Sequence, residues 1–270
     1  MNTPPTVPQT AELDAPPAWG TVDFISDLHL QADAPATFAA WQHYMESTPA
    51  DAVFMLGDLF EAWVGDDAVS DDVASTACVG AFEDRCAHVM GQTASRLALF
   101  FMHGNRDFLV GQRLMDLCNT ALLADPTVLG FHRQRWLLSH GDALCLADTD
   151  YMAFRQQVRS AAWQSDFLAK PLTERQALAR GLRQQSQAQH DKRQLSGLAY
   201  ADVDSAAALA QLRAADAHIL IHGHTHQPAV HDLGHGFSRV VLSDWDAAAT
   251  VPRAEVLRLT AGGLRRISLL

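Results

Sequence analysis

The chain lacks the features that would place it across a membrane or outside the cell. No apolar run approaches the roughly 20 residues that a bilayer-spanning helix needs, so any membrane contact is expected to be peripheral. Residues 1–18 are rich in proline and have neither a basic start nor an apolar segment, which excludes a signal peptide and predicts a disordered tail. Without any Cys-x-x-Cys spacing or secretory leader, the cysteines are expected to be reduced core thiols in the cytosol: Cys78, Cys86, Cys118 and Cys145.

Positive charge is also scarce. The 270 residues include 20 Lys plus Arg against 31 Asp plus Glu, a formal net charge of -11, which argues against nucleic acid as a partner. A hydrophobic content of 48% is sufficient for a substantial core. Internal repeats are absent, and no linker follows residue 20. The composition therefore predicts one domain over residues 19–270, and it gives no reason to infer an obligate protein partner.

Five apolar runs are each followed directly by residues of metal-ligand type. The runs are Thr21 to Ile25, Ala52 to Leu56, Leu97 to Met102, Trp136 to Leu138 and Ala217 to Ile221. Side chains two positions apart on a strand share a face, so His224 and His226 should leave the last run on the same side. The full candidate set is Asp27, His29, Asp58, Asn105, His140, His224 and His226.

Helical patterns alternate with these runs and indicate an α/β arrangement. In such sheets ligands bind outside the carboxyl ends of the strands, so the five loops are expected to converge. Further strands are expected at Val240 to Ser243, Ala254 to Leu259 and Leu264 to Leu270. The helices are expected at Ala36 to Ser47, within Val69 to Ala94, and at Phe108 to Cys118 and Asp202 to Ala214.

One segment, about residues 148–200, breaks the alternation because it offers no strand. It carries eight Lys or Arg against five acids, a local net charge of +3, so the rest of the chain has a net charge of -14. One interpretation is a solvated helical insertion. The other is a basic amphipathic lid for an anionic, partly apolar ligand or a membrane surface. Its apolar candidates are Tyr151, Phe154 and Val158 on one helical face, with Phe167, Leu168, Pro171 and Leu172.

The seven candidate ligands are carboxylates, imidazoles and an amide, without a thiolate. This mixture suits Mn²⁺, Fe²⁺ or Zn²⁺ rather than a thiolate-rich structural zinc site. Seven ligands are too many for one ion with open positions, whereas two ions sharing a carboxylate would use them all. Two such ions, about 3.5 to 4 Å apart, hold the attacking and leaving oxygens and bring the pKa of a bound water to about 7. The natural reaction is hydrolysis of a phosphorus ester.

Taken in order, the motifs Asp-x-His, Gly-Asp, Gly-Asn, a His before Gly-Asp, and Gly-His-x-His resemble those of the calcineurin-like metallophosphoesterases. The resemblance runs from about Asp27 to His226 and implies a two-sheet α/β sandwich flanked by helices. It also implies a ligand assignment: one metal on Asp27, His29 and His226, the other on Asn105, His140 and His224, and Asp58 between them.

Arg106 departs from the superfamily pattern, in which Gly-Asn is usually followed by His. A guanidinium does not donate its proton at neutral pH, but it binds phosphate oxygens through a bidentate fork. The leaving group must then need little protonation, which fits a phosphate leaving from a diphosphate.

Together with Arg106, the stretches Gly57 to Asp67, Gly104 to Phe108 and Gly223 to Pro228 resemble the UDP-2,3-diacylglucosamine pyrophosphohydrolase family of lipid A synthesis. That resemblance implies two Mn²⁺ ions, water attack on the α-phosphorus, and UMP and 2,3-diacylglucosamine 1-phosphate as products. It further implies that the helical insertion caps the acyl chains, and that the enzyme is cytoplasmic and peripherally associated with the inner membrane.

Roles for individual residues follow from the same resemblance. The implied catalytic set is Asp58, Asn105, Arg106 and His140. The implied substrate contacts are Asn105, Arg106, Asp148, Tyr151, Arg183, Ser186, His224 and one of Lys192 and Arg193, a choice that the sequence leaves open.

Other polar residues near the motifs have less specific interpretations. Asp142 is expected to orient His140 through its free ring nitrogen. Asp66 and Asp67 either support the ligands or face solvent. Three histidines near the motifs are expected to be structural or to support the ligands: His103, His222 and His231. Trp63 and Trp245 are expected in the core.

Two alternative functions have to be weighed. A phosphodiesterase or nuclease on the same dinuclear scaffold would need a basic groove, and the acidic charge outside the insertion argues against one. A non-catalytic scaffold would be favoured by missing ligands, and none of the seven is missing.

Overall fold

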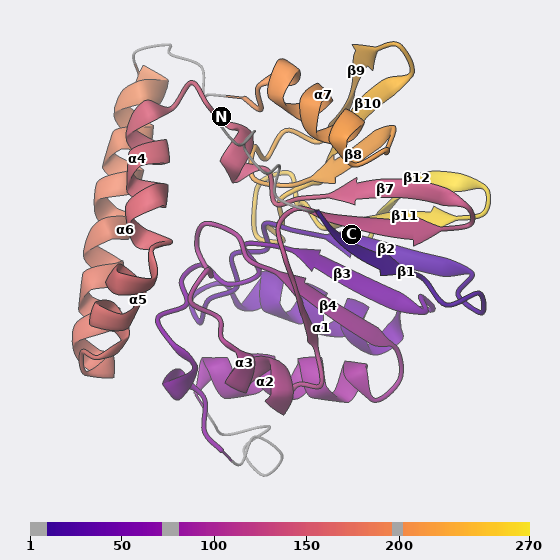
Figure 1. Ribbon diagram of the computed structural model, residues 1–270. Helices are drawn as coiled ribbons and strands as arrows, with labels where there is room; N and C mark the ends of the chain where they lie inside the picture. Colours follow the sequence, from indigo (N-terminus) through magenta and orange to yellow (C-terminus); the bar gives the residue numbers. More distant parts are fainter. Residues whose placement is uncertain (1–9, 72–80, 196–201) are drawn as a thin grey trace, which may run out of the picture.

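Two six-stranded mixed sheets stack face to face, with helices on both outer faces (Figure 1). The computed structural model describes residues 10–71, 81–195 and 202–270, and within 184–195 it describes the backbone alone. Helices α1 (Pro35–Ser47) and α2 (Phe82–Ala94) cover one outer face, and α7 (Ser205–Ala214) covers the other. The two-sheet sandwich expected from the sequence is confirmed.

The first sheet contains three neighbouring parallel strands, β7, β8 and β10, and their carboxyl ends therefore share one edge. Its order is β1 (Ala11–Asp14), β6 (Thr127–Phe131), β7 (Gln134–Leu138), β8 (Ile219–His222), β10 (Phe237–Val241) and β9 (Ala229–Gly234).

The second sheet has four parallel neighbours, β2 to β5, and ends in an antiparallel hairpin. All five residues of β3 are buried because both faces of the strand are covered, which explains its continuous apolar sequence. The order is β12 (Gly263–Ser268), β11 (Glu255–Thr260), β2 (Thr21–Ile25), β3 (Ala52–Leu56), β4 (Ala98–Met102) and β5 (Ala121–Leu123).

The apolar core lies in three layers. Between the sheets, Phe54 stacks on Phe100 with ring centroids 4.4 Å apart, and Phe24 packs beside Phe54. The outer layers form around Trp41 of α1 and around Leu212 of α7. Close packing of this kind fixes the spacing between the sheets, because interiors tolerate few voids.

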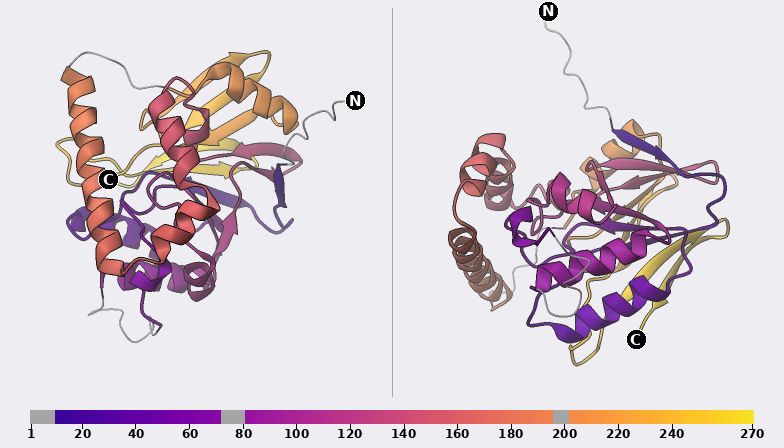
Figure 2. Two further views of the ribbon diagram at one scale, coloured as in Figure 1. Left: turned by 60° about the vertical axis from the view of Figure 1, so that its left-hand side comes forward. Right: turned by 90° about the horizontal axis from the view of Figure 1, so that it is seen from below.

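Three helices form the insertion: α4 (Thr149–Val158), α5 (Ala161–Leu168) and α6 (Leu172–Leu195). They lie together beside the sandwich, next to the loops that follow the parallel strands (Figure 2). Asp148 caps α4 by accepting a hydrogen bond from the Tyr151 amide at 3.2 Å. We call these three helices the lid.

Buried Arg175 of α6 fastens the lid to the core. Its guanidinium donates to the Val64 carbonyl and pairs with Asp67, and it also reaches the Lys170 carbonyl at 2.9 Å. Asp67 therefore serves the lid and not the ligand cluster. Asp66 is structural as well, since it accepts from Trp63 and from the Gly111 and Leu114 amides.

Several sequence predictions need correction. The tail prediction is wrong for Ala11–Asp14, which forms β1 because Leu13 packs against the layer between the sheets; residues 1–9 lie outside the described part. The helix expected over Phe108 to Cys118 is confined to α3 (Gln112–Leu117). Phe154 is 40% exposed instead of packing with Val158. Strands β5, β6 and β9 were not predicted, and within the described ranges two 3-10 helices occur at Asp66–Ala68 and Asp142–Leu144.

The predicted burial of the cysteines and of two tryptophans is confirmed for the described residues. Among the described cysteines, Cys86, Cys118 and Cys145 are free and buried, while Cys78 lies outside the described residues. Trp63 and Trp245 belong to the core. Within the described ranges, none of the helices has the length and apolar character needed to cross a bilayer.

Candidate metal centre

The loops after the parallel strands meet at one edge of the sandwich. Backbone hydrogen bonds join them in pairs: the Asp27 amide donates to the Gly57 carbonyl at 3.1 Å, and the His29 amide donates to the Asp58 carbonyl at 3.0 Å. On the other sheet, the Gly223 amide donates to the carbonyl of His140 at 3.0 Å. All seven candidate ligands are thereby brought together, and their positions are set by the two sheets.

One group of donor atoms comes from Asp27, His29 and His226. The Nε2 atoms of His29 and His226 lie 3.2 Å apart, and His226 Nε2 is 3.3 Å from an oxygen of Asp27. One donor atom from each of the three residues lies within 4.8 Å of the others. Ring nitrogens that face one another beside a buried carboxylate suit a cation between them.

A second group adjoins the first. The amide oxygen of Asn105 lies 2.8 Å from His224 Nδ1 and 3.1 Å from His140 Nε2. Asp58 lies against this group, with its oxygen 3.8 Å from His140 Nε2, and its carboxylate also falls within 4.8 Å of that of Asp27. Asp58 is therefore the residue placed between the two groups.

The electrostatics of the cluster favour bound positive charge. Burial opposes ionisation of Asp27, yet its hydrogen bond with His226 and the nearby imidazoles hold its pKa far below the usual range. Burial alone would lower the pKa of His140, but Asp58 and Asp27 raise it to about 9. Burial lowers the pKa of His224 to about 4, which keeps its ring neutral and able to coordinate. These donors fit divalent cations.

Five of the seven candidate ligands have left-handed backbone. Such conformations cost of order 1–3 kcal/mol each and cluster at functional sites. Asp and His tolerate them better than most residues. The φ angles are 56° at Asp27, 48° at His29, 53° at Asp58, 68° at His224 and 53° at His226.

Two glycines allow the loops to approach. A Cβ atom on Gly104 would lie 2.0 Å from a carboxylate oxygen of Asp58, and one on Gly223 would lie 2.2 Å from an oxygen of Asp27. Neither neighbour is free to move, since Asp58 accepts a hydrogen bond from the Arg106 amide and Asp27 accepts one from the His224 amide. Glycine is required at both positions.

Asp107 is a buried residue that the sequence reasoning missed. Its carboxylate accepts from the amides of Leu59 and Gly104, both at 2.8 Å, and so ties the Asp58 loop to the Asn105 loop. Burial and the charge of Asp58 raise the pKa of Asp107 to about 7. The available signal was an acid directly after Gly104-Asn105-Arg106, in a stretch otherwise flanked by apolar residues.

The expected role of Asp142 is wrong. His140 Nδ1 lies 2.9 Å from the Leu56 carbonyl oxygen, not from Asp142. Asp142 instead accepts from the Tyr151 hydroxyl at 2.6 Å and from Arg155 at 2.7 Å. The chain turns between His140 and Asp142 at Gly141, which has a φ of 106°, and Asp142 faces the lid. Asp142 is thus an anchor for α4.

We predict that Asp142→Asn destabilises the protein by about 2 kcal/mol, because hydrogen bonds to charged groups contribute roughly 1.5–3 kcal/mol each. The urea midpoint measures this loss. The matched control is Asp166→Asn, at an exposed position of the lid helix α5, which should change the midpoint little. Equal midpoints for the two variants would contradict the anchoring role.

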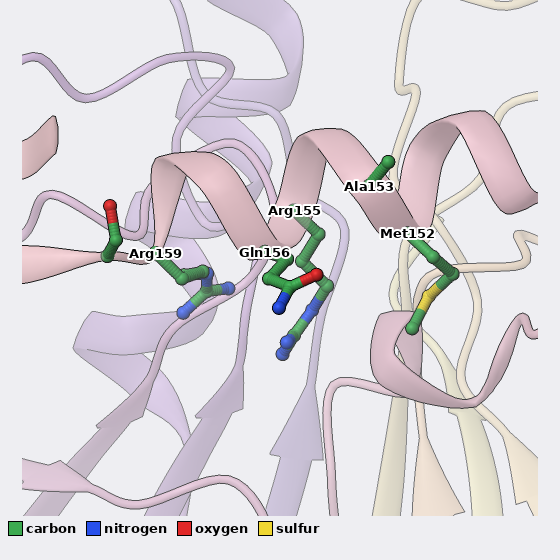
Figure 3. Close-up of a pocket in the computed structure, with 6 residues that line it drawn as sticks. Met152, Ala153, Arg155, Gln156 and Arg159 are labelled. Atoms are coloured by element: carbon green, nitrogen blue, oxygen red, sulfur yellow. The ribbon is translucent and has the colours of Figure 1, made fainter.

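A cavity of about 620 Å³ lies along α4, and Arg155 and Arg159 extend to the same side of the helix (Figure 3). From there Arg159 donates to the Gly104 carbonyl at 2.8 Å, so the cavity borders a loop of the ligand cluster. It is lined by Met152, Ala153, Arg155, Gln156, Arg159 and Ser160.

Three of the expected substrate contacts lie beside the ligand cluster: Tyr151, Arg106 and Arg183. The Tyr151 ring lies beside His224, with centroids 5.8 Å apart. Arg106 and Arg183 both face Glu61, at 3.6 Å and 2.8 Å. Burial would raise the pKa of Glu61, but His29 and the two arginines lower it. The side chains of Ser186, Lys192 and Arg193 lie outside the described residues.

Two adjoining donor groups at the strand ends of a two-sheet sandwich define the class of the protein: a metal-dependent phosphoesterase. Residues 20–228 match the family described as "Calcineurin-like phosphoesterase". The chain is 41% identical to the UDP-2,3-diacylglucosamine hydrolase of Cellvibrio japonicus, covering 84% of this chain and 95% of the relative. Identity is also 41% to the hydrolase of that name from Chromobacterium violaceum, with coverages of 92% and 98%.

The chain therefore belongs to the calcineurin-like phosphoesterase family and, within it, to the UDP-2,3-diacylglucosamine hydrolases. Family, fold and the hydrolase class are as predicted from the sequence. A solved archaeal phosphodiesterase is also similar, at 11% identity and a TM-score of 0.44 over 92% of this chain and 99% of that one.

Proposed function

We propose that this hydrolase cleaves the diphosphate of UDP-2,3-diacylglucosamine, releasing UMP and 2,3-diacylglucosamine 1-phosphate for lipid A biosynthesis. The observation that carries the proposal is the pair of guanidiniums, Arg106 and Arg183, that face Glu61 beside the donor cluster. Two arginines suit the two phosphates of a diphosphate, because each fork binds phosphate oxygens bidentately. The names of the similar hydrolases support the same substrate.

The proposed centre holds two Mn²⁺ ions. They would supply a hydroxide-like nucleophile at neutral pH and neutralise charge on the phosphate oxygens. The ligands follow the two donor groups: Asp27, His29 and His226 for one ion, Asn105, His140 and His224 for the other, and Asp58 for both.

The other proposed catalytic roles belong to the chain's own residues. Asn105 and His224 lie where the attacked phosphate would enter, and Arg106 is fixed there through its amide, which donates to Asp58 at 2.8 Å. Arg106 binds charge without donating a proton. The leaving phosphate of the acylated sugar is a weak base, so it departs without an acid.

The lid is the proposed site of the acylated sugar. Tyr151 and Asp148 lie at its start, Arg183 further along, and Ser186 with Lys192 or Arg193 extends the proposed contacts along α6. Exposed apolar side chains of the lid would receive the acyl chains. These are Phe154, Leu168, Leu178 and Leu182, each at least 40% exposed.

The same exposed apolar side chains, together with the basic charge of the lid, support a peripheral association with the cytoplasmic face of the inner membrane. Leu178 and Leu182 are one turn apart on α6 and share a face. This face would let the lid take its acylated substrate from the bilayer surface.

The experiment that tests the function is UMP release in ¹⁸O-labelled water. Attack on the α-phosphorus places the label in UMP, whereas attack on the other phosphorus places it in the sugar phosphate. UDP-N-acetylglucosamine, which lacks the acyl chains, is the control and should be cleaved far more slowly. Cleavage of single-stranded DNA or a simple phosphodiester without UMP release from the acylated substrate would support the nuclease alternative instead.

We predict that Arg183→Ala raises the KM for the acylated substrate roughly 10- to 100-fold, as loss of a charge-assisted contact of about 1.5–3 kcal/mol implies. Metal content should stay unchanged, because Arg183 is not among the candidate metal ligands. Arg180→Ala removes an exposed arginine of the same helix and is the matched control. Loss of metal from the Arg183 variant would contradict the lid assignment.

A further inference from the structure

Glu61 joins a candidate metal ligand to both proposed phosphate-binding arginines. One carboxylate oxygen lies 3.2 Å from Nδ1 of His29. The other lies 2.8 Å from Nε of Arg183 and 3.6 Å from Nη1 of Arg106. The His29 loop, the Asn105 loop and the lid therefore meet at one side chain of the Asp58 loop.

The backbone fixes the position of this carboxylate. The Glu61 amide donates to the Leu30 carbonyl at 3.1 Å, and the Leu30 amide donates to the Leu59 carbonyl at 2.8 Å. Leu30 and Phe60 also form a bridge between the loops that follow β2 and β3. The Glu61 side chain is 13% exposed. Glu61 is thus held at the point where the His29 loop and the Asp58 loop run side by side.

An imidazole presents one ring nitrogen as a donor and the other as an acceptor when it is neutral. The Glu61 oxygen 3.2 Å from Nδ1 favours a proton on that nitrogen, and this tautomer leaves the lone pair of Nε2 free on the side of His226, whose Nε2 is 3.2 Å away. A carboxylate in this position fixes both the tautomer and the orientation of a metal-binding ring.

The contact with Arg183 has a different character. The Arg183 side chain is 45% exposed and also donates a hydrogen bond to Gln31 at 2.9 Å. An ion pair that is partly open to solvent contributes little stability. A diphosphate is able to replace Glu61 as the partner of Arg183, because the pair holds the guanidinium in place without binding it tightly.

We propose that Glu61 is a positioning residue with two tasks: it orients His29 for the metal, and it keeps Arg183 of the lid beside the centre until a substrate phosphate takes over. The first task stands on the donor cluster alone. The second rests on the proposed function, because it requires a phosphate-bearing substrate.

The first experiment measures metal binding to metal-free protein by titration calorimetry with Mn²⁺ alone. Glu61→Ala removes the partner of His29 and should weaken binding about 10- to 100-fold. Glu61→Gln keeps an oxygen acceptor and should stay within about threefold of wild type. Glu174→Gln, which breaks the exposed lid pair with Lys170, is the matched control and should not change the affinity.

Wild-type affinity in the folded Glu61→Ala variant would overturn the first task. If Glu61→Ala does not give a native circular dichroism spectrum, Glu61→Gln is the deciding variant. A 10-fold loss of Mn²⁺ affinity in Glu61→Gln would show that the acceptor oxygen is not the feature that matters, and it would also overturn the first task.

The second experiment is a double-mutant cycle on KM at saturating Mn²⁺. Arg183→Ala should raise KM about tenfold or more, whereas Glu61→Gln should raise it about two- to fivefold, as loss of a partly exposed ion pair implies. The double variant should resemble Arg183→Ala, because both changes disturb one interaction. Multiplicative effects, or an unchanged KM in Glu61→Gln, would overturn the second task. Wild-type protein that releases no UMP would refute the proposed function, while the calorimetry would still judge the first task.

Discussion

Replacing Asp58 by Asn is expected to lower turnover about a thousandfold or more. Asp58 lies between the two donor groups, 3.8 Å from His140 Nε2 and within reach of Asp27. Removing a shared ligand loses charge on both sides of the centre at once. Stabilisation of a phosphoryl transition state by a bound metal contributes several kcal/mol, and about 4 kcal/mol corresponds to a thousandfold in rate.

Asn keeps an oxygen that accepts from the Arg106 amide, whereas Asp58→Ala would lose this hydrogen bond as well and should be equally inactive. The measurement is the rate of UMP release together with metal content by mass spectrometry. Asp116→Asn changes an exposed acid on α3 and should retain full activity. Near-wild-type turnover in either Asp58 variant would contradict the dinuclear arrangement.

Prolonged chelation is expected to silence the enzyme, and Mn²⁺ is expected to restore it best. The donor set consists of carboxylates, imidazoles and one amide, without the thiolates that would retain zinc most tightly. Four of the seven candidate ligands are at least partly accessible: His29, Asn105, His224 and His226. The metal should therefore leave and return without unfolding the protein.

The chelation experiment needs removal of the chelator before each metal is added back. Mn²⁺, Zn²⁺, Mg²⁺ and Ca²⁺ are compared at equal free concentration, with circular dichroism showing that the metal-free protein is folded. Activity that persists after metal has been shown to be absent would refute metal-assisted attack. If another ion restores the highest activity, the proposed identity of the metal is wrong, but the dinuclear arrangement is not contradicted.

The sequence predicted the strands that carry the donors because those strands are buried on both faces. Ala52 to Leu56 and Ala217 to Ile221 read as uninterrupted apolar runs, and the polar residues after them stand out. Strand β1 gave no such signal. Its pattern alternates between half-buried and exposed residues in a proline-rich stretch, and it forms only where β6 offers a parallel partner.

The sequence did not predict which side chains from different loops contact one another. Asp142 lies two residues from His140, yet it serves Tyr151 and Arg155 on the lid. Glu61 was visible only as one letter in a matching motif, and its contacts come from the loop after β2, the Asn105 loop and α6. Such contacts depend on how separate loops pack, which no local pattern encodes.

The stacked phenylalanines between the sheets have a consequence for the chemistry itself. Each proposed metal takes ligands from both sheets: Asp27 and Asn105 follow strands of one, and His140 and His226 follow strands of the other. Phe54 and Phe100 stack on neighbouring strands of one sheet and belong to the apolar layer between the sheets, so this layer sets how far the candidate ligands of one sheet lie from those of the other. The rate of the reaction should therefore depend on the size of apolar side chains in this layer, although these side chains do not contact the substrate.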